Sequence, residues 1–186
     1  VSTIAVDLDG TLYEYHTAYC YMANNYLSAK LDATRWVDWD YPSRHLDSGQ
    51  LEWMSSLAVE RGLYRYGHVM KGGIIGVNKL AQRHDIIVIT HRPRSAVKDT
   101  LAWLTYVNLP LSGVHILSDK QPKSSVKFDL LIDDKPDNIE DAICHARGGI
   151  LFDQTWNQNA VYKWPVRATW HNMEEAVSER SRSIRP

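Results

Sequence analysis

Short runs of apolar, often β-branched residues alternate along this chain with segments whose apolar residues recur at helical spacing. A run of about five such residues suits a strand buried in a parallel sheet, where helices cover both faces. Alternating strands and helices with short connections favour this architecture over a sandwich or a bundle. We therefore predict an α/β fold with a doubly wound parallel sheet. The predicted strands are 3–7, 86–90, 113–117, 129–133 and 149–153, with 166–170 as an edge strand.

One connection in this alternation is too long to be a simple loop. Residues 15–72 separate the first strand's loop from the helix that precedes the second strand, whereas ordinary βα loops have about 2–6 residues. The segment contains two helix-like stretches, 18–31 and 51–61, around an irregular middle. We predict a small helical cap inserted after the first strand. The predicted division is a core of 1–14 and 73–177, a cap of 15–72 and a flexible tail of 178–186.

Composition excludes several classes of protein. The chain has 186 residues and a net charge of −1, so it lacks the excess of Lys and Arg that a large nucleic-acid-binding surface needs. No stretch approaches the roughly 18 apolar residues that a membrane span requires. Cys20 and Cys144 stand far apart and outside any CxxC, as reduced thiols do. We expect a cytoplasmic protein with no signal peptide, no membrane contact and no stable nucleic-acid complex; the sequence leaves a homodimer open.

Polar side chains stand at the carboxyl ends of three predicted strands. Asp7 and Asp9 follow the first strand, Thr90 ends the second, and Asp133 and Asp134 end the third. Because the carboxyl ends of parallel strands meet at one edge of the sheet, these side chains should converge there. Four carboxylates would repel one another unless a hard cation lay among them, and Mg²⁺ suits such ligands. Carboxylates, Mg²⁺, a hydroxyl and a lysine are what phosphoryl transfer needs.

The order of these residues resembles the four motifs of the haloacid dehalogenase (HAD) superfamily. The matching residues are Asp7-Leu8-Asp9-Gly10-Thr11, then Thr90, then Lys123, then Asp133-Asp134. The resemblance spans about 3–153 and implies the Rossmann-like core of that superfamily. The spacing from Lys123 to Asp133 resembles the 5′(3′)-deoxyribonucleotidase branch, although Lys120 and Lys127 are rivals for the phosphate lysine on charge alone.

The resemblance implies a role for each motif residue. Asp7 would be the nucleophile that forms an aspartyl-phosphate, and Asp9 would be the general acid and base. Thr90 and Lys123 would complete the catalytic set by holding the phosphoryl oxygens. An aspartate at position 9 accompanies phosphate-ester hydrolysis in this superfamily, so a Mg²⁺-dependent phosphatase is implied. The implied metal ligands are Asp7, the backbone carbonyl of Asp9, Asp133 and, through a water, Asp134.

Aromatic residues crowd the predicted cap. Residues 12–72 hold eight of the ten tyrosines and three of the seven tryptophans. Such rings stack on nucleobases for about 1–3 kcal/mol each, so a nucleoside monophosphate is a fitting substrate. Most of these rings should instead fill the core of the cap. The exception is Tyr15, which resembles the base-stacking aromatic of the deoxyribonucleotidases; Trp36 is a second candidate, and Trp39 and Tyr41 are weaker ones.

The chain departs from the nucleotidase branch directly after Thr90. That branch often has a small residue and a proline there, whereas this chain has His91-Arg92-Pro93. His91 would contact the phosphate or the sugar, or it would cap the following helix. Two other functions stay open: a HAD phosphatase for a nucleic-acid 3′ phosphate or a small phosphate ester, and a non-enzyme, either an inactive HAD-like module or a phospho-acceptor regulatory domain.

Overall fold

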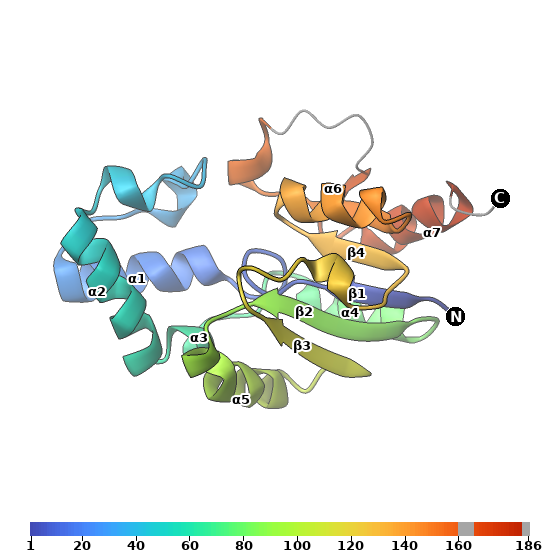
Figure 1. Cartoon of the computed structure of the whole chain (residues 1–186), viewed down its shortest axis with the longest axis horizontal. Helices are drawn as coiled ribbons and strands as arrows, with labels where there is room; N and C mark the ends of the chain where they lie inside the picture. The colour runs from blue at the N-terminus through green and yellow to red at the C-terminus, as the bar shows by residue number, and fades with distance from the viewer. Residues whose placement is uncertain (160–165, 184–186) are drawn as a thin grey trace.

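Six strands form a single sheet in which every neighbouring pair is parallel. The computed structural model describes residues 1–159 and 166–183 (Figure 1). The strand order is β3-β2-β1-β4-β5-β6, so the prediction of a doubly wound parallel sheet is confirmed. The strands are β1 (Thr3–Val6), β2 (Asp85–His91), β3 (Gly113–Leu117), β4 (Leu130–Asp133), β5 (Gly148–Phe152) and β6 (Val166–Ala168).

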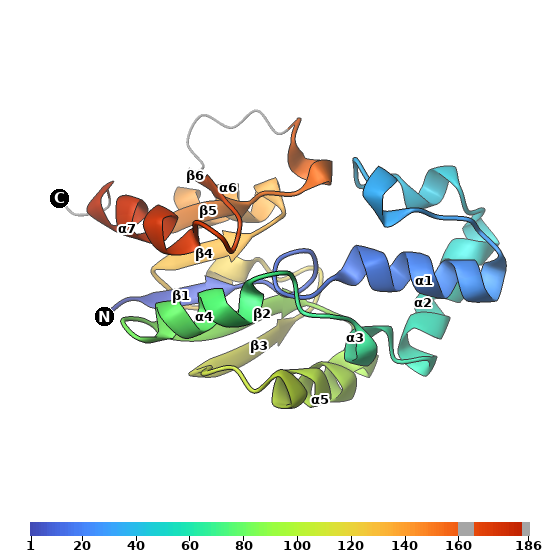
Figure 2. The same ribbon diagram turned by 180° about the vertical axis from the view of Figure 1, so that it is seen from behind.

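Helices cover both faces of this sheet. Successive residues of a strand point to opposite faces, so the apolar residues of one strand contact helices on both sides. Ile4 and Val6 of β1 pack into a cluster that includes residues of α4, α5 and α7, whereas Ala5 between them packs into a cluster with residues of α6. Figure 2 shows α4 and α7 together on one side of the sheet. These helices are α4 (Gly73–Ala81), α5 (Val97–Val107), α6 (Pro136–Cys144) and α7 (Met173–Ser183).

The C-terminal part of the chain differs from its prediction. A flexible tail was expected over 178–186, but α7 continues to Ser183. Buried Met173, Ala176 and Val177 anchor the first half of this helix against the sheet, and the chain then continues helically. The residues after Ser183 lie outside the described ranges.

None of the described helices is long and apolar enough to span a membrane.

The segment between β1 and β2 forms a second helical group. Figure 1 shows α1 and α2 to one side of the sheet, at the end where β1 leads into α1. These helices enclose their own apolar cluster, which includes Tyr19, Trp36 and Leu57. Trp156, from the loop after β5, belongs to the same cluster and thereby joins the two groups. The helices are α1 (Tyr15–Leu27), α2 (Ser48–Glu60) and α3 (Leu63–Tyr66), with short 3-10 turns at Ala33–Arg35 and Pro42–Arg44.

Candidate active site

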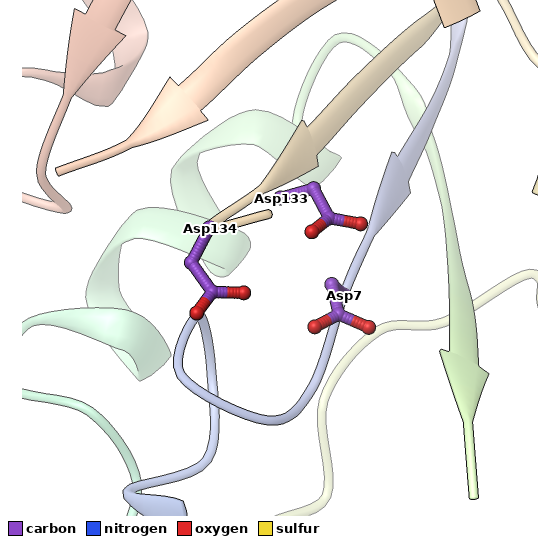
Figure 3. Close-up of side chains that lie close together, drawn as sticks. All are labelled: Asp7, Asp133 and Asp134. Atoms are coloured by element: carbon purple, nitrogen blue, oxygen red, sulfur yellow. The ribbon is translucent and has the colours of Figure 1, made fainter. Parts of the chain in front are cut away.

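Three buried carboxyl groups meet at the carboxyl ends of two central strands (Figure 3). Asp7 directly follows β1, Asp133 ends β4, and Asp134 comes next. The two strands are neighbours in register, with Val6 opposite Ile132. One oxygen from each carboxyl group lies within 4.8 Å of the others. The strand order reverses at this point, which is where open α/β sheets bind their ligands.

The burial of these acids has an electrostatic consequence. Burial raises the pKa of Asp7 to about 7, against the opposing influence of Lys123. Burial and the charges of Asp133 and Asp7 also hold the pKa of Asp134 well above its usual range. A bound cation would relieve this repulsion and favour the ionised carboxylates. Three clustered carboxyl oxygens are the hard ligands that Mg²⁺ prefers, so the residues fit this ion.

Lys123 lies against two of the acids. Its Nζ donates to Oδ1 of Asp7 at 2.5 Å and to Oδ2 of Asp133 at 2.6 Å. Burial alone would lower the pKa of Lys123, but these two carboxylates outweigh it and raise that pKa above its ordinary value. The rival lysines, Lys120 and Lys127, are exposed. The structure therefore brings Lys123, and neither rival, into contact with the acid cluster.

Two threonine hydroxyls are left unpaired in the same region. Thr90 is the penultimate residue of β2 and is 1% exposed, and Thr11 lies on the loop after β1 and is fully buried. Neither Oγ1 atom has a hydrogen-bond partner within the described residues. An unsatisfied buried hydroxyl is costly, about 1–3 kcal/mol. The Thr90 hydroxyl, at the carboxyl end of its strand, is therefore suited to a phosphoryl oxygen.

Asp9 is paired with an arginine that sequence reasoning did not assign to the site. Nε and Nη2 of Arg92 donate to Oδ2 and Oδ1 of Asp9 at 2.9 and 2.5 Å. Arg92 is 2% exposed and follows β2 directly. The adjacent His91 is half-buried, and its Nε2 lies 2.8 Å from the carbonyl oxygen of Gln121. Its predicted contact with a phosphate or sugar stays a prediction.

The loop after β5 also supports the acid cluster, and no sequence motif pointed to it. Nε1 of Trp156 donates to Oδ2 of Asp134 at 2.7 Å, and Nδ2 of Asn157 donates to the backbone carbonyl of Asp134 at 2.8 Å. Nε2 of Gln154 donates to the carbonyl of Gly10, on the loop that follows β1, at 2.6 Å. This loop therefore fixes both Asp134 and the turn that carries Asp7.

The predicted base-contacting residues, Tyr15 and Trp36, lie among other aromatic rings of the segment between β1 and β2. Tyr15 is half-buried at the start of α1, and its ring centroid lies 6.2 Å from that of Tyr64. Trp36 is buried edge-on against His16 at 4.5 Å, and its Nε1 has no partner within the described part of the chain. Substrate binding by Tyr15 and Trp36 stays a prediction. Of the weaker candidates, Tyr41 is buried and Trp39 is 48% exposed.

His16 makes the stability of this aromatic group depend on pH. Burial lowers the pKa of His16 to about 3, and its ring centroid lies 3.6 Å from that of Trp156. The unfolded chain protonates this histidine near its ordinary pKa of about 6.5, so below that pH the unfolded state binds more protons and gains stability. Between about pH 7.5 and pH 5 this histidine should lower the free energy of unfolding by about 2 kcal/mol.

The test compares the wild type with His16→Gln in urea titrations at several pH values. The variant should lack this part of the pH dependence, whatever its stability at neutral pH. The exposed His171→Gln serves as the matched control and should keep the wild-type slope. Parallel pH profiles for the wild type and His16→Gln would contradict a neutral, buried His16.

A family model matches almost the whole chain. Residues 1–182 match the family described as "5' nucleotidase, deoxy (Pyrimidine), cytosolic type C protein". No curated protein sequence matches the chain significantly.

Solved structures show the same fold at low sequence identity. A haloacid dehalogenase-like hydrolase from Xanthomonas campestris has a TM-score of 0.63 at 12% identity, covering 99% of this chain and 97% of that one. A similar protein from Streptococcus pneumoniae has a TM-score of 0.66 at 13% identity, covering 95% and 98%. A predicted phosphoglycolate phosphatase from Haemophilus somnus has a TM-score of 0.63 at 15% identity, covering 95% and 97%. The chain therefore belongs to the cytosolic type C deoxy-5′-nucleotidase family of the HAD superfamily and is a phosphoric monoester hydrolase.

Proposed function

We propose that this enzyme is a Mg²⁺-dependent 5′(3′)-deoxyribonucleotidase that hydrolyses nucleoside monophosphates through an aspartyl-phosphate on Asp7. The observation that carries the proposal is the contact of Asp7 with Lys123 inside a buried group of acids. A nucleophilic carboxylate, a fixed cation and a cluster of metal-binding oxygens are the parts that phosphoryl transfer requires. The family match supports the nucleotide as substrate and a cytosolic location.

The proposed reaction consists of two displacements at phosphorus, in which Asp7 and Asp9 take part. An oxygen of Asp7 forms a bond to phosphorus while the ester oxygen leaves, and Asp9 gives that oxygen a proton. Asp9 then takes a proton from a water molecule, whose oxygen displaces Asp7 and yields inorganic phosphate. Lys123 and the Thr90 hydroxyl hold the phosphoryl oxygens through both steps.

The proposed metal site is supported by the carboxyl oxygens of Asp7, Asp133 and Asp134, which lie within 4.8 Å of one another. Asp7, Asp133 and the backbone carbonyl of Asp9 would hold Mg²⁺, with Asp134 acting through a water. When bound, the ion would neutralise part of the charge on the phosphoryl oxygens. Its presence would also keep Asp7 ionised, because a neighbouring cation favours the carboxylate.

Mg²⁺ should stabilise the folded protein in a pH-dependent way. Protons compete with the metal for Asp7 and Asp134, whose pKa values are raised, so binding should weaken as the pH falls. At a concentration 100 times Kd, the ion should add about 2.7 kcal/mol to the free energy of unfolding. Thermal melts with Mg²⁺ and with EDTA should therefore differ more at about pH 8 than at about pH 5.5. A Tm independent of Mg²⁺ at both pH values would contradict the site; Asp134→Asn should reduce the shift.

Tyr15 is proposed to stack on the nucleobase. It is half-buried at the start of α1, and the nucleophile loop leads directly into it. Tyr15→Ala should raise KM for the preferred nucleotide about 5-fold to 150-fold, the effect of losing about 1–3 kcal/mol of stacking. Tyr15→Phe should retain most of the affinity, and KM for a phosphate ester without a base should change little. A Tyr15→Ala enzyme with an unaltered nucleotide KM would contradict this role.

The substrate class is tested by phosphate release from a panel of deoxyribo- and ribonucleoside 5′- and 3′-monophosphates, with Mg²⁺ and with EDTA. We expect Mg²⁺-dependent release that favours the deoxynucleotides. Hydrolysis of a simple aryl phosphate or of a 3′-phosphorylated oligonucleotide, with every mononucleotide inert, would keep the phosphatase and overturn the nucleotidase. The same panel therefore separates the two substrate classes left open by the sequence.

A further inference from the structure

Arg92 has the most complete set of contacts of the charged residues around the site. Besides its two bonds to Asp9, its Nη1 donates to Oγ1 of Thr100 at 3.1 Å and to the backbone carbonyl of Tyr64 at 3.3 Å. Its guanidinium carbon lies 4.6 Å from the ring centroid of Tyr13 and 5.0 Å from that of Tyr64. All three guanidinium nitrogens therefore donate hydrogen bonds, and two aromatic rings lie close to the group.

Such an environment gives the arginine one orientation. A buried cation is tolerated only when its partners satisfy it, and the planar fork of a guanidinium group matches the two oxygens of a carboxylate. The Asp9 side chain is in turn fixed in plane, yet it remains 21% exposed. Arg92 therefore fixes the orientation of the Asp9 carboxyl group, and part of this side chain stays accessible to solvent.

We propose that Arg92 is the positioning residue for the general acid of this enzyme. It holds the Asp9 carboxyl group beside the nucleophile, and its bond to Tyr64 ties that group to α3 of the segment between β1 and β2. Arg92 does not need to contact the substrate for this purpose. The inference rests on the proposed function, since it requires that Asp9 protonate a leaving alkoxide.

The basicity of the leaving group distinguishes positioning from a purely structural ion pair. A nucleoside leaves as a basic alkoxide and needs a proton from Asp9, whereas p-nitrophenolate leaves without one. kcat/KM covers only the steps up to release of the leaving group, so the later role of Asp9 as a base does not enter. A loss of folded enzyme lowers both values equally and leaves their ratio unchanged.

The experiment measures kcat/KM for the best deoxynucleotide and for p-nitrophenyl phosphate in the Mg²⁺-loaded wild type and its variants. We expect Arg92→Gln to lower the ratio of the two values about 10-fold or more, in the same direction as Asp9→Asn, because general acid catalysis contributes about 10²–10⁴. Arg92→Lys should restore part of the ratio, since it keeps the charge but not the fork. Arg94→Gln, an exposed arginine of the same loop, should behave as wild type.

The double variant Arg92→Gln/Asp9→Asn completes the test. If Arg92 acts through Asp9, the double variant has the nucleotide kcat/KM of Asp9→Asn alone. The inference would be overturned if the kcat/KM losses of the two single variants multiplied in the double variant, or if Arg92→Gln lowered kcat/KM equally for both substrates. Either result would leave the proposed function intact. A wild type inactive on both substrates would overturn the proposed function and the inference together.

Discussion

Asp7→Asn is expected to reduce phosphate release from a nucleotide by on the order of 10⁴-fold or more, because the amide is a far weaker nucleophile than the carboxylate. The loss should appear in kcat with p-nitrophenyl phosphate as well, since a good leaving group does not replace the nucleophile. Initial rates with saturating Mg²⁺ measure both effects.

This loss should occur without unfolding. Burial opposes the ionised form of Asp7, so a neutral amide of nearly the same shape should leave Tm close to that of the wild type. Lys123 keeps its second partner, Asp133, in this variant. Asp85→Asn, an exposed aspartate at the start of β2, provides the control and should keep full activity. Turnover of Asp7→Asn within 10-fold of the wild type, by the same rate assay, would contradict a nucleophilic role.

Lys123→Met is expected to affect both stability and catalysis. The change leaves Asp7 and Asp133 buried without their shared cation, and breaking a buried ion pair costs about 3–5 kcal/mol. The loss of the charge on the phosphoryl oxygens should lower kcat by about 10²–10³ in the fraction that remains folded. Urea titration in EDTA measures the first effect, and rates on the folded protein measure the second.

The neighbouring lysines serve as matched controls. Lys120→Met and Lys127→Met remove the same charge from exposed positions close in sequence, and surface substitutions usually change stability by less than about 0.5 kcal/mol. An unchanged stability of Lys123→Met, or an equal loss of activity in Lys127→Met, would contradict the assignment of Lys123.

The sequence predicted the sheet and the meeting of its acids because both depend on local patterns. A short β-branched run such as 86–90, between segments with helical spacing, is typical of a buried parallel strand, and parallel strands bring their carboxyl ends to one edge of the sheet. The resemblance to the deoxyribonucleotidase branch favoured Lys123 over Lys120 and Lys127, and in the structure its Nζ lies 2.5 Å from Oδ1 of Asp7. The extent of α7 was missed because its last turns have no apolar stripe.

The supporting residues could not be predicted in this way. Arg92 reaches Asp9 only because the chain turns inward immediately after β2, and no spacing rule reports the direction of a loop side chain. Trp156 contacts Asp134 from a segment 22 residues further along, and neither residue type nor pattern marks it. Arg92, two residues after Thr90, was the available signal, since a charged residue next to the end of a buried strand needs a partner when it is itself buried.

Detection of a phosphoryl group on Asp7 would test the proposed mechanism directly. Asp9→Asn is mixed with p-nitrophenyl phosphate and Mg²⁺, quenched in acid within milliseconds to seconds, and analysed by intact mass and peptide mapping. Because p-nitrophenolate leaves without a proton, Asp7 can be phosphorylated in the Asp9→Asn variant. Hydrolysis of the phosphorylated enzyme is slowed, because it needs Asp9 as a base. We predict one phosphoryl group per chain, located on Asp7 and absent from the Asp7→Asn/Asp9→Asn double variant. Release of p-nitrophenol with no phosphorylated protein, or phosphorylation at another residue, would contradict Asp7 as the nucleophile.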